Sequence, residues 1–211
     1  MIYEIRTYDL TPGSQAEVEK RFGDAYAKRK SFSEAAAFFH TDIGPLNQLV
    51  HIWPYGDLVE RARIQAAAES AGVWPPDTGP FVVRMRSDVM MPFPYSPELK
   101  PGKAGACFEF CTDTYLSGDL PKVMQRWQAA LPKRLELSPL CALWYSEVGG
   151  ALYNFVHIWA YDSLDQMQDV RERASAGGAW PPASGTGADG AYTLHSQETK
   201  ILLPAAFSPV Y

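Results

Sequence analysis

The sequence predicts an α+β fold in which two tandem ferredoxin-like βαββαβ repeats form one fused, pseudo-dimeric α/β barrel. The main observation is an internal repeat: residues 49–55 read LVHIWPY, and residues 155–161, 106 positions later, read FVHIWAY. Each copy is about a hundred residues long, which is the size of a small domain and too long for a solenoid unit. The second observation is the order of strand-like and helix-like segments, which matches this arrangement. Because the sheet of such a repeat has helices on one face only, two repeats can cover each other's open face.

The limits of the two copies follow from further repeated segments. Residues 73–76, VWPP, return as AWPP at 179–182. Several prolines and a glycine lie between the two copies, and such residues are typical of a linker. We therefore predict a first repeat over residues 1–98, a linker over 99–105 and a second repeat over 106–211.

The first repeat begins with a predicted strand and a predicted helix. Residues 2–8 form the strand, in which alternate side chains point to opposite faces. Pro12-Gly13 is typical of a turn. Ser14 followed by Glu17 then predicts a capping box at the start of a helix. The apolar stripe of this helix consists of Val18, Phe22, Ala25 and Tyr26.

Two strands, a second helix and a last strand complete the repeat. Residues 37–42 and 47–53 are predicted strands, because β-favouring residues lie on either side of a Gly-Pro turn. Asp57 followed by Glu60 predicts the start of the second helix, and residues 81–91 form the last strand. The second copy has the same capping chemistry at Ser163 and Gln166.

Composition excludes several classes of partner. The chain has 211 residues, is 46% hydrophobic and carries a formal net charge of −5, with no block of Lys and Arg. Neither nucleic acid nor an anionic membrane surface is therefore an expected partner, and no apolar run is long enough to span a bilayer. The odd set of cysteines, Cys107, Cys111 and Cys141, favours a reducing compartment. No leader-like segment precedes the first strand, so we expect a cytoplasmic protein.

Three segments of the first repeat resemble the NIPSNAP family: GPLNQLVHIWPY at 44–55, IYEIRTY at 2–8 and FPYSP at 93–97. The second repeat keeps VHIWAYDSL at 156–164 but reads GALYN at 150–154. It also has Cys111 where the first repeat has Arg6. The resemblance implies a dimeric α/β-barrel type of fold, shared with small cofactor-free monooxygenases, EthD-like proteins and haem-handling relatives. It does not imply one reaction.

The candidate catalytic residues are His51, Arg6 and Asn47. Residues 47, 49, 51 and 53 share one face of a strand, and we expect this face to point into the central cavity of the barrel. His51 is the candidate general base. Arg6 is suited to hold a carboxylate or enolate oxygen, and Asn47 to donate to a developing oxyanion.

A larger set of residues is predicted to bind substrate. These residues are Trp53, Tyr8, Glu4, His40, Glu109, His157 and Trp159. A structural role is the competing interpretation, because His51 and Trp53 recur as His157 and Trp159 and could fill the barrel in both copies. A salt bridge between Glu4 and Arg6 is likewise the plainer interpretation of that pair. The second copy has Cys111 in place of Arg6 and Tyr153 in place of Asn47. We therefore expect the functional site in the first repeat.

These residues predict a small cofactor-independent oxygenase or isomerase that acts on an aromatic or polyketide-like molecule in the barrel cavity. The alternative is a non-catalytic small-molecule-binding or assembly protein. Haem is a minor alternative by fold analogy, with His51, His157 or His195 as the axial ligand. No other cofactor is expected, and no metal site is predicted, because the histidines lack ligand spacing. A small-molecule ligand is the expected partner, and a homodimer remains open.

Overall fold

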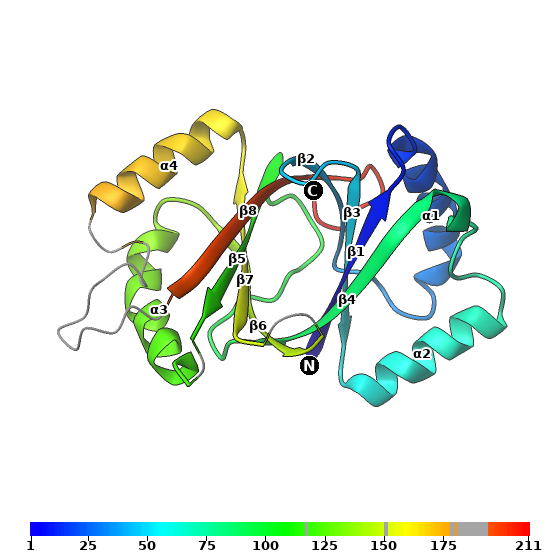
Figure 1. The fold of residues 1–211 in the computed structure, drawn as a ribbon, viewed down its shortest axis with the longest axis horizontal. Coiled ribbons are helices and arrows are strands. Elements are labelled where there is room, and N and C mark those ends of the chain that lie inside the picture. The colour runs from blue at the N-terminus through cyan, green and yellow to red at the C-terminus, as the bar shows by residue number, and fades with distance from the viewer. Residues whose placement is uncertain (117, 150–151, 178–179, 181–193) are drawn as a thin grey trace.

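The computed structural model describes residues 1–116, 118–149, 152–177, 180 and 194–211, and Figure 1 shows their arrangement. The first repeat contains β1 (Ile2–Leu10), α1 (Gln15–Arg29), β2 (Ala37–Ile43), β3 (Gln48–Tyr55), α2 (Leu58–Ser70) and β4 (Val82–Pro92). The second repeat contains β5 (Cys107–Tyr115), α3 (Leu120–Leu135), β6 (Leu140–Val148), β7 (Asn154–Tyr161), α4 (Leu164–Ala176) and β8 (Leu194–Pro204). The predicted βαββαβ order is confirmed in both repeats.

The eight strands close one barrel within the single chain, in the order β1-β3-β2-β8-β5-β7-β6-β4. The last strand of each repeat bonds to the other repeat: β8 pairs with β2, and β4 pairs with β6, all antiparallel. The two sheets face each other in the middle of Figure 1, with α1 and α2 outside one sheet and α3 and α4 outside the other. This arrangement confirms the fused α/β barrel. Among the described residues, no helix combines the length and apolar character needed to cross a bilayer.

Much of the barrel interior is an apolar core shared by both repeats. Tyr3 stacks on Trp144 with ring centroids 4.2 Å apart, and Phe39 meets Phe108 at 4.8 Å. Further buried members are Ile5, Val50, Ile52, Phe110, Val156, Ile158 and Leu202. Because side chains from both repeats make up this core, neither sheet buries its inner face without the other.

The expected orientation of the third strand is wrong. Val50 and Ile52 point into the barrel, whereas His51 and Trp53 pack beneath the helices. Alternation identifies which residues share a face, but both faces of β3 are buried in this barrel. The β-branched side chains pack in the core between the sheets. The polar and aromatic face lies outside, where helix side chains supply its partners.

The predicted N-cap hydrogen bonds are present at α2 and α4 but not at α1. Asp57 accepts a hydrogen bond from the Glu60 backbone N–H at 2.8 Å, and Ser163 accepts one from Gln166 at 3.1 Å. Both are the N-cap contacts that the sequence predicts. The Ser14 side chain instead turns back to donate to the Thr11 carbonyl at 2.7 Å, so the predicted capping box is not formed.

The segment before β5 approaches β7 so closely that it needs a residue without a side chain. A Cβ on Gly105 would lie 2.7 Å from the Tyr161 carbonyl oxygen and 2.8 Å from its nitrogen. We expect Gly105→Ala to lower the free energy of unfolding by about 1–3 kcal/mol, because the two backbones must separate. Gly79→Ala is the matched control, since a Cβ there meets nothing within 4 Å. Urea unfolding of both variants tests this, and equal midpoints would contradict the close-approach explanation.

Candidate functional site

The second repeat contains a cavity of about 260 Å³ between its sheet and its helices. We call it the helix–sheet cavity. The strands contribute Glu109, Cys111, Asp113, His157, Trp159, Gln197 and Thr199. The helices and the residue beyond α4 contribute Trp127, Arg134, Arg171, Ala174, Ser175 and Trp180. Its size is slightly below the range of about 300–1,000 Å³ typical of small-molecule sites.

A comparison of the two repeats explains this cavity. Arg6 lies opposite His51 in the first sheet, and Cys111 lies opposite His157 in the second. Two residues further along the same strands, Tyr8 is replaced by Asp113. Both replacements are smaller, so side chains that fill the space beneath α1 and α2 have no counterpart of equal volume beneath α3 and α4.

His157 is the central ionisable group of the cavity, and its side chain is buried. Its Nε2 lies 3.4 Å from Oδ2 of Asp113, and its Nδ1 accepts a hydrogen bond from the indole N–H of Trp159 at 2.8 Å. Gln197 donates to the other oxygen of Asp113 at 2.9 Å. Burial alone would raise the pKa of Asp113, but the contacts with His157, Gln197 and Tyr115 lower it below its usual range.

Opposing effects set the protonation of His157. Burial lowers its pKa, but the neighbouring Cys111 thiol and Asp113 carboxylate outweigh burial and raise the pKa to about 10. The indole of Trp159 can only donate, so the nitrogen that accepts from it carries no proton. Protonation of His157 at Nδ1 must therefore break the hydrogen bond from Trp159.

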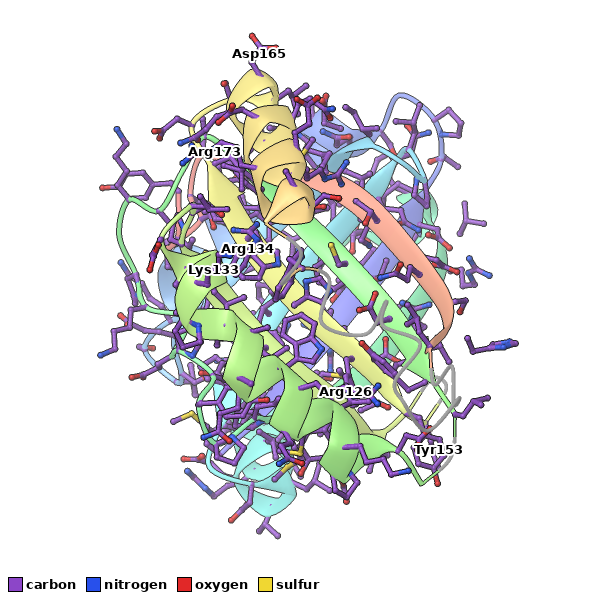
Figure 2. All side chains as sticks on the ribbon, turned by 90° about the vertical axis from the view of Figure 1, so that its left-hand side faces the viewer. Arg126, Lys133, Arg134, Tyr153, Asp165 and Arg173 are labelled. Carbon is purple, nitrogen blue, oxygen red and sulfur yellow. The ribbon has the colours of Figure 1, made fainter. Side chains whose placement is uncertain are left out.

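Two arginines place positive charge in the cavity. Arg171 of α4 donates from Nε to Glu109 at 3.0 Å and also pairs with it through Nη2. Arg134 of α3 donates to Ser138 at 2.8 Å and to the Tyr161 hydroxyl at 3.0 Å. Its guanidinium lies over the Trp159 ring, 3.9 Å from the centroid. Figure 2 views this side of the molecule, with Arg134 and Lys133 near one end of α3 and Arg173 on α4.

The Arg134 guanidinium is a cation that has only neutral partners. Its side chain is 4% exposed, and within the described part of the chain no carboxylate oxygen lies within 4.0 Å of it. Arg29 makes the equivalent contacts in the first repeat, with Ser33 at 2.9 Å and the Trp53 ring at 4.6 Å. The packing of these arginines is thus common to both repeats. Arg134 differs because it borders a cavity in which an anionic group can meet it.

The predicted first-repeat site is packed rather than hollow. His51 is enclosed by the rings of Tyr8, Phe22 and Phe38, at centroid distances of 4.8, 4.4 and 4.5 Å. Burial, followed by the charge of Arg6, lowers the pKa of His51 well below its ordinary range. This histidine is therefore neutral at pH 7, and its surroundings match the predicted packing role.

The predicted pair of Glu4 and Arg6 forms a salt bridge at 2.8 Å, which confirms the plainer interpretation. Asn47 does not join His51: it lies in the turn before β3 with φ 58°, and its carbonyl accepts from Leu10 at 2.8 Å. Tyr153 has φ 64° at the equivalent position of the second repeat, so this backbone shape belongs to the repeat. His40 lies apart as well, with Nδ1 2.7 Å from Glu19 of α1.

Of the predicted residues, Glu109, His157 and Trp159 lie together in the helix–sheet cavity. Four further residues of the cavity were not predicted as site residues: Asp113, Trp127, Arg134 and Arg171. Cys111 was noted only as a departure from the repeat. A position-by-position alignment of β1 with β5 would have revealed Asp113, because it places Asp113 at the position of Tyr8. Arg171 gave no such signal, because its contact with Glu109 joins segments 62 residues apart.

The residues around His51 and His157 do not fit haem. His157 engages one ring nitrogen with Trp159 and directs the other toward Asp113, while aromatic rings enclose His51. For haem to bind, its iron would need an accessible imidazole nitrogen, and the macrocycle would need room beside that histidine. His195 is exposed on β8. Among the residues with described positions, no group of three or more His, Cys, Asp or Glu side chains is arranged to hold a metal ion.

The family model described as NIPSNAP matches residues 3–97 and again residues 108–209. The Drosophila melanogaster protein NipSnap is 24% identical over 223 residues, covering 99% of this chain and 78% of that protein. A NipSnap homologue from Dictyostelium discoideum is 38% identical over 73 residues, covering 35% of this chain. That match spans about a third of the Dictyostelium protein, 33% of its length.

Several solved structures match nearly the whole chain. A putative monooxygenase from Lactobacillus acidophilus has a TM-score of 0.64 at 9% identity, covering 97% of this chain and 94% of that one. An anthrone oxidase-like protein has a TM-score of 0.63 at 9% identity, covering 96% and 90%. At this identity the likeness shows the shared fold alone.

Proposed function

This chain belongs to the NIPSNAP family as a tandem pair of its domains, and we propose that it is an enzyme acting in the helix–sheet cavity of the second repeat. The proposed reaction removes a proton from a small aromatic or polyketide-like molecule, which then isomerises or reacts with O₂ without a bound organic cofactor. The observation that carries the proposal is the contact of His157 with Asp113 in a cavity that the first repeat fills. The proposed site therefore differs from the barrel cavity and the first-repeat residues predicted from the sequence.

The geometry supports His157 as the base in this reaction. In its neutral form Nδ1 carries the free electron pair, and Nε2–H faces the Asp113 carboxylate, which stabilises the imidazolium that forms. A substrate C–H group placed at Nδ1 displaces the indole N–H of Trp159. The enolate oxygen that develops carries negative charge, and Arg134 is the cation available to it. Protonation at a second carbon completes an isomerisation, whereas reaction of the carbanion with O₂ completes an oxygenation.

The walls of the cavity favour a flat, apolar molecule. Trp180 meets Trp127 and Trp159 edge to face, with centroids 4.7 and 5.3 Å apart. Aromatic walls of this kind bind ring systems by stacking and by edge contacts. The same three indoles make ligand entry visible as a change in tryptophan fluorescence.

Anthrone is a suitable first probe, because it is a flat ketone with an acidic C–H group. Its oxidation consumes one O₂ and yields anthraquinone and one water, so an oxygen electrode and absorbance measure the same reaction. We expect the protein to quench its tryptophan fluorescence on binding anthrone and to speed this oxidation above the buffer rate. Quenching without faster oxidation would favour the alternative of a non-catalytic binding protein. Absence of both would contradict the proposed substrate class.

Substitution at Cys111 tests whether the helix–sheet cavity is the site. We expect Cys111→Arg to abolish both the quenching and the oxidation, because it adds the larger side chain that the first repeat carries at this position. Cys111→Ser preserves the volume and is expected to keep both activities, since no bond to sulfur is made or broken in the proposed step. Because Cys111 contributes to the raised pKa of His157, we expect the pH dependence of the rate to shift to lower pH in this variant. Thermal unfolding checks that both variants fold. Full activity in Cys111→Arg would place the reaction elsewhere.

A homodimer remains a proposal as well. Because the barrel closes within one chain, a second copy is not required to build the helix–sheet cavity.

A further inference from the structure

Besides the helix–sheet cavity, the barrel contains a cavity that is lined by residues of both repeats. This cavity, of about 290 Å³, is lined by Thr7, Asp9, Pro45, Gln48, Arg84, Met85, Arg86, Phe110, Thr112, Glu198, Thr199 and Lys200. We call it the Lys200 cavity. Of its described lining residues, only Thr199 also borders the helix–sheet cavity. The two spaces lie on opposite faces of the second sheet and can bind different molecules.

Lys200 is the cation of this cavity that lacks an anionic partner. Arg84 pairs with Asp9 at 2.6 Å, and Arg86 pairs with Asp88 at 2.8 Å. Lys200 instead donates to the amide oxygen of Gln48 at 3.3 Å and lies 5.0 Å from the centroid of the Phe110 ring. Considering the described residues only, no carboxylate oxygen lies within 4.0 Å of its ammonium group.

The position of Lys200 carries a different charge in the first repeat. Met90 pairs with Tyr3 in the first sheet as Leu202 pairs with Phe108 in the second. Two residues earlier, Asp88 is therefore the counterpart of Lys200, and Arg86 is the counterpart of Glu198. The first repeat closes its pair of charges into a salt bridge, whereas no such bridge joins the described side chains of Glu198 and Lys200.

The side chain of Lys200 is also held in place. Gly44, at the turn after β2, lies so close that a Cβ there would be 2.9 Å from the Cβ of Lys200. Burial lowers the pKa of Lys200 to about 8, and the charge of Arg86 acts in the same direction. The other charged groups that face this amine are Asp9, Asp88 and Glu198. These carboxylates act against burial, but within the described residues none of them forms a direct ion pair with the ammonium group.

We propose that the Lys200 cavity is a second binding site, which takes a small carboxylate with an apolar body and pairs its carboxylate with the Lys200 ammonium. Thr7 and Gln48 supply further polar contacts, and Phe110 supplies an apolar wall. A bound carboxylate would give Lys200 the opposite charge that Asp88 gives Arg86 in the first repeat. Binding at this site does not depend on the reaction proposed for the helix–sheet cavity.

Calorimetric titration with benzoate tests this site. We expect the wild-type protein to bind one benzoate per chain, and Lys200→Met to weaken binding about tenfold or more, because a charge-assisted hydrogen bond is lost. Lys20→Met is the matched control, since Lys20 is exposed and pairs with Asp24 at 2.7 Å on α1. Benzoate affinity is also expected to fall as pH rises through about 8, where Lys200 loses its charge.

The variant Cys111→Arg separates the two cavities, because residue 111 lines the helix–sheet cavity and not the Lys200 cavity. Benzoate binding that survives in Cys111→Arg and weakens in Lys200→Met supports the proposal. Binding that is lost in Cys111→Arg and kept in Lys200→Met overturns it by assigning benzoate to the helix–sheet cavity. No binding to the wild-type protein, or equal affinity in wild type and Lys200→Met, overturns it as well.

Discussion

Glu4→Ala is expected to lower the free energy of unfolding by roughly 3–5 kcal/mol, the range for removing one partner of a buried ion pair. Glu4 is fully buried and accepts four hydrogen bonds. The donors are Arg6 at 2.8 Å, Arg61 at 2.6 Å, Ser87 at 2.6 Å and Gln65 at 3.0 Å. They come from β1, α2 and β4, so this carboxylate joins the sheet of the first repeat to a helix. Without it, the positive charges of Arg6 and Arg61 lie beneath the helices without compensation.

Glu17→Ala is the control for this prediction. Glu17 pairs with Arg21 at 2.7 Å along one face of α1, but its side chain is 48% exposed. Exposed pairs contribute little, so we expect a loss of less than about 1 kcal/mol. Denaturant unfolding of both variants measures the difference. A similar loss in the two proteins would show that the network around Glu4 does not stabilise the fold.

The contribution of Glu4 depends on pH. Burial raises its pKa, but the hydrogen bond from Arg61, the charge of Arg6 and the bond from Ser87 together lower it below the ordinary value of 4.5. A carboxyl whose pKa is lower in the folded state stabilises fully above its unfolded pKa and loses that effect as pH falls. We therefore expect the stability difference between wild type and Glu4→Gln to be constant near neutral pH and to shrink below about pH 4.5.

The fold was predictable because its evidence is repeated in the chain. Two His-x-Trp strands 106 positions apart, and N-caps at Asp57 and Ser163, are local signals that hold whatever surrounds them. The direction in which each strand face points was not predictable in the same way. His51 and Val50 lie on opposite faces of β3, and both are buried. Only the assembled barrel decides which face meets the other sheet and which meets the helices.

The site depended on side-chain volume more than on residue type. His157 and Trp159 were identified from the sequence, but so were their counterparts His51 and Trp53, which occupy a packed layer. The difference lies in neighbouring positions, where Arg6 and Tyr8 give way to Cys111 and Asp113. Arg134 was not predictable, because Arg29 has the same place in the first repeat without bordering such a cavity. A local sequence pattern cannot predict a cavity that forms only where the second sheet, α3 and α4 come together.

His157→Gln is expected to reduce the protein-dependent rate of anthrone oxidation by about 10²- to 10⁴-fold, the usual contribution of a positioned general base. Glutamine retains groups that can meet Asp113 and the Trp159 indole, but it cannot take up a proton. In the wild-type protein, the reaction needs the unprotonated imidazole, and the pKa of His157 is raised to about 10. The rate should therefore increase with pH toward about 10, and this increase should be absent from the variant.

His51→Gln provides the matched control, because it makes the same change on the equivalent strand beneath the other pair of helices. We expect it to keep the activity and its pH dependence, since burial holds His51 neutral. Tryptophan fluorescence gives a readout that does not depend on turnover: protonation of His157 breaks its bond from Trp159, so emission should titrate in wild type and His51→Gln but not in His157→Gln. Loss of activity in His51→Gln alone would move the reaction to the first repeat. Equal rates in wild type and His157→Gln, with the fluorescence titration abolished, would show that this imidazole titrates in the cavity without acting as the base.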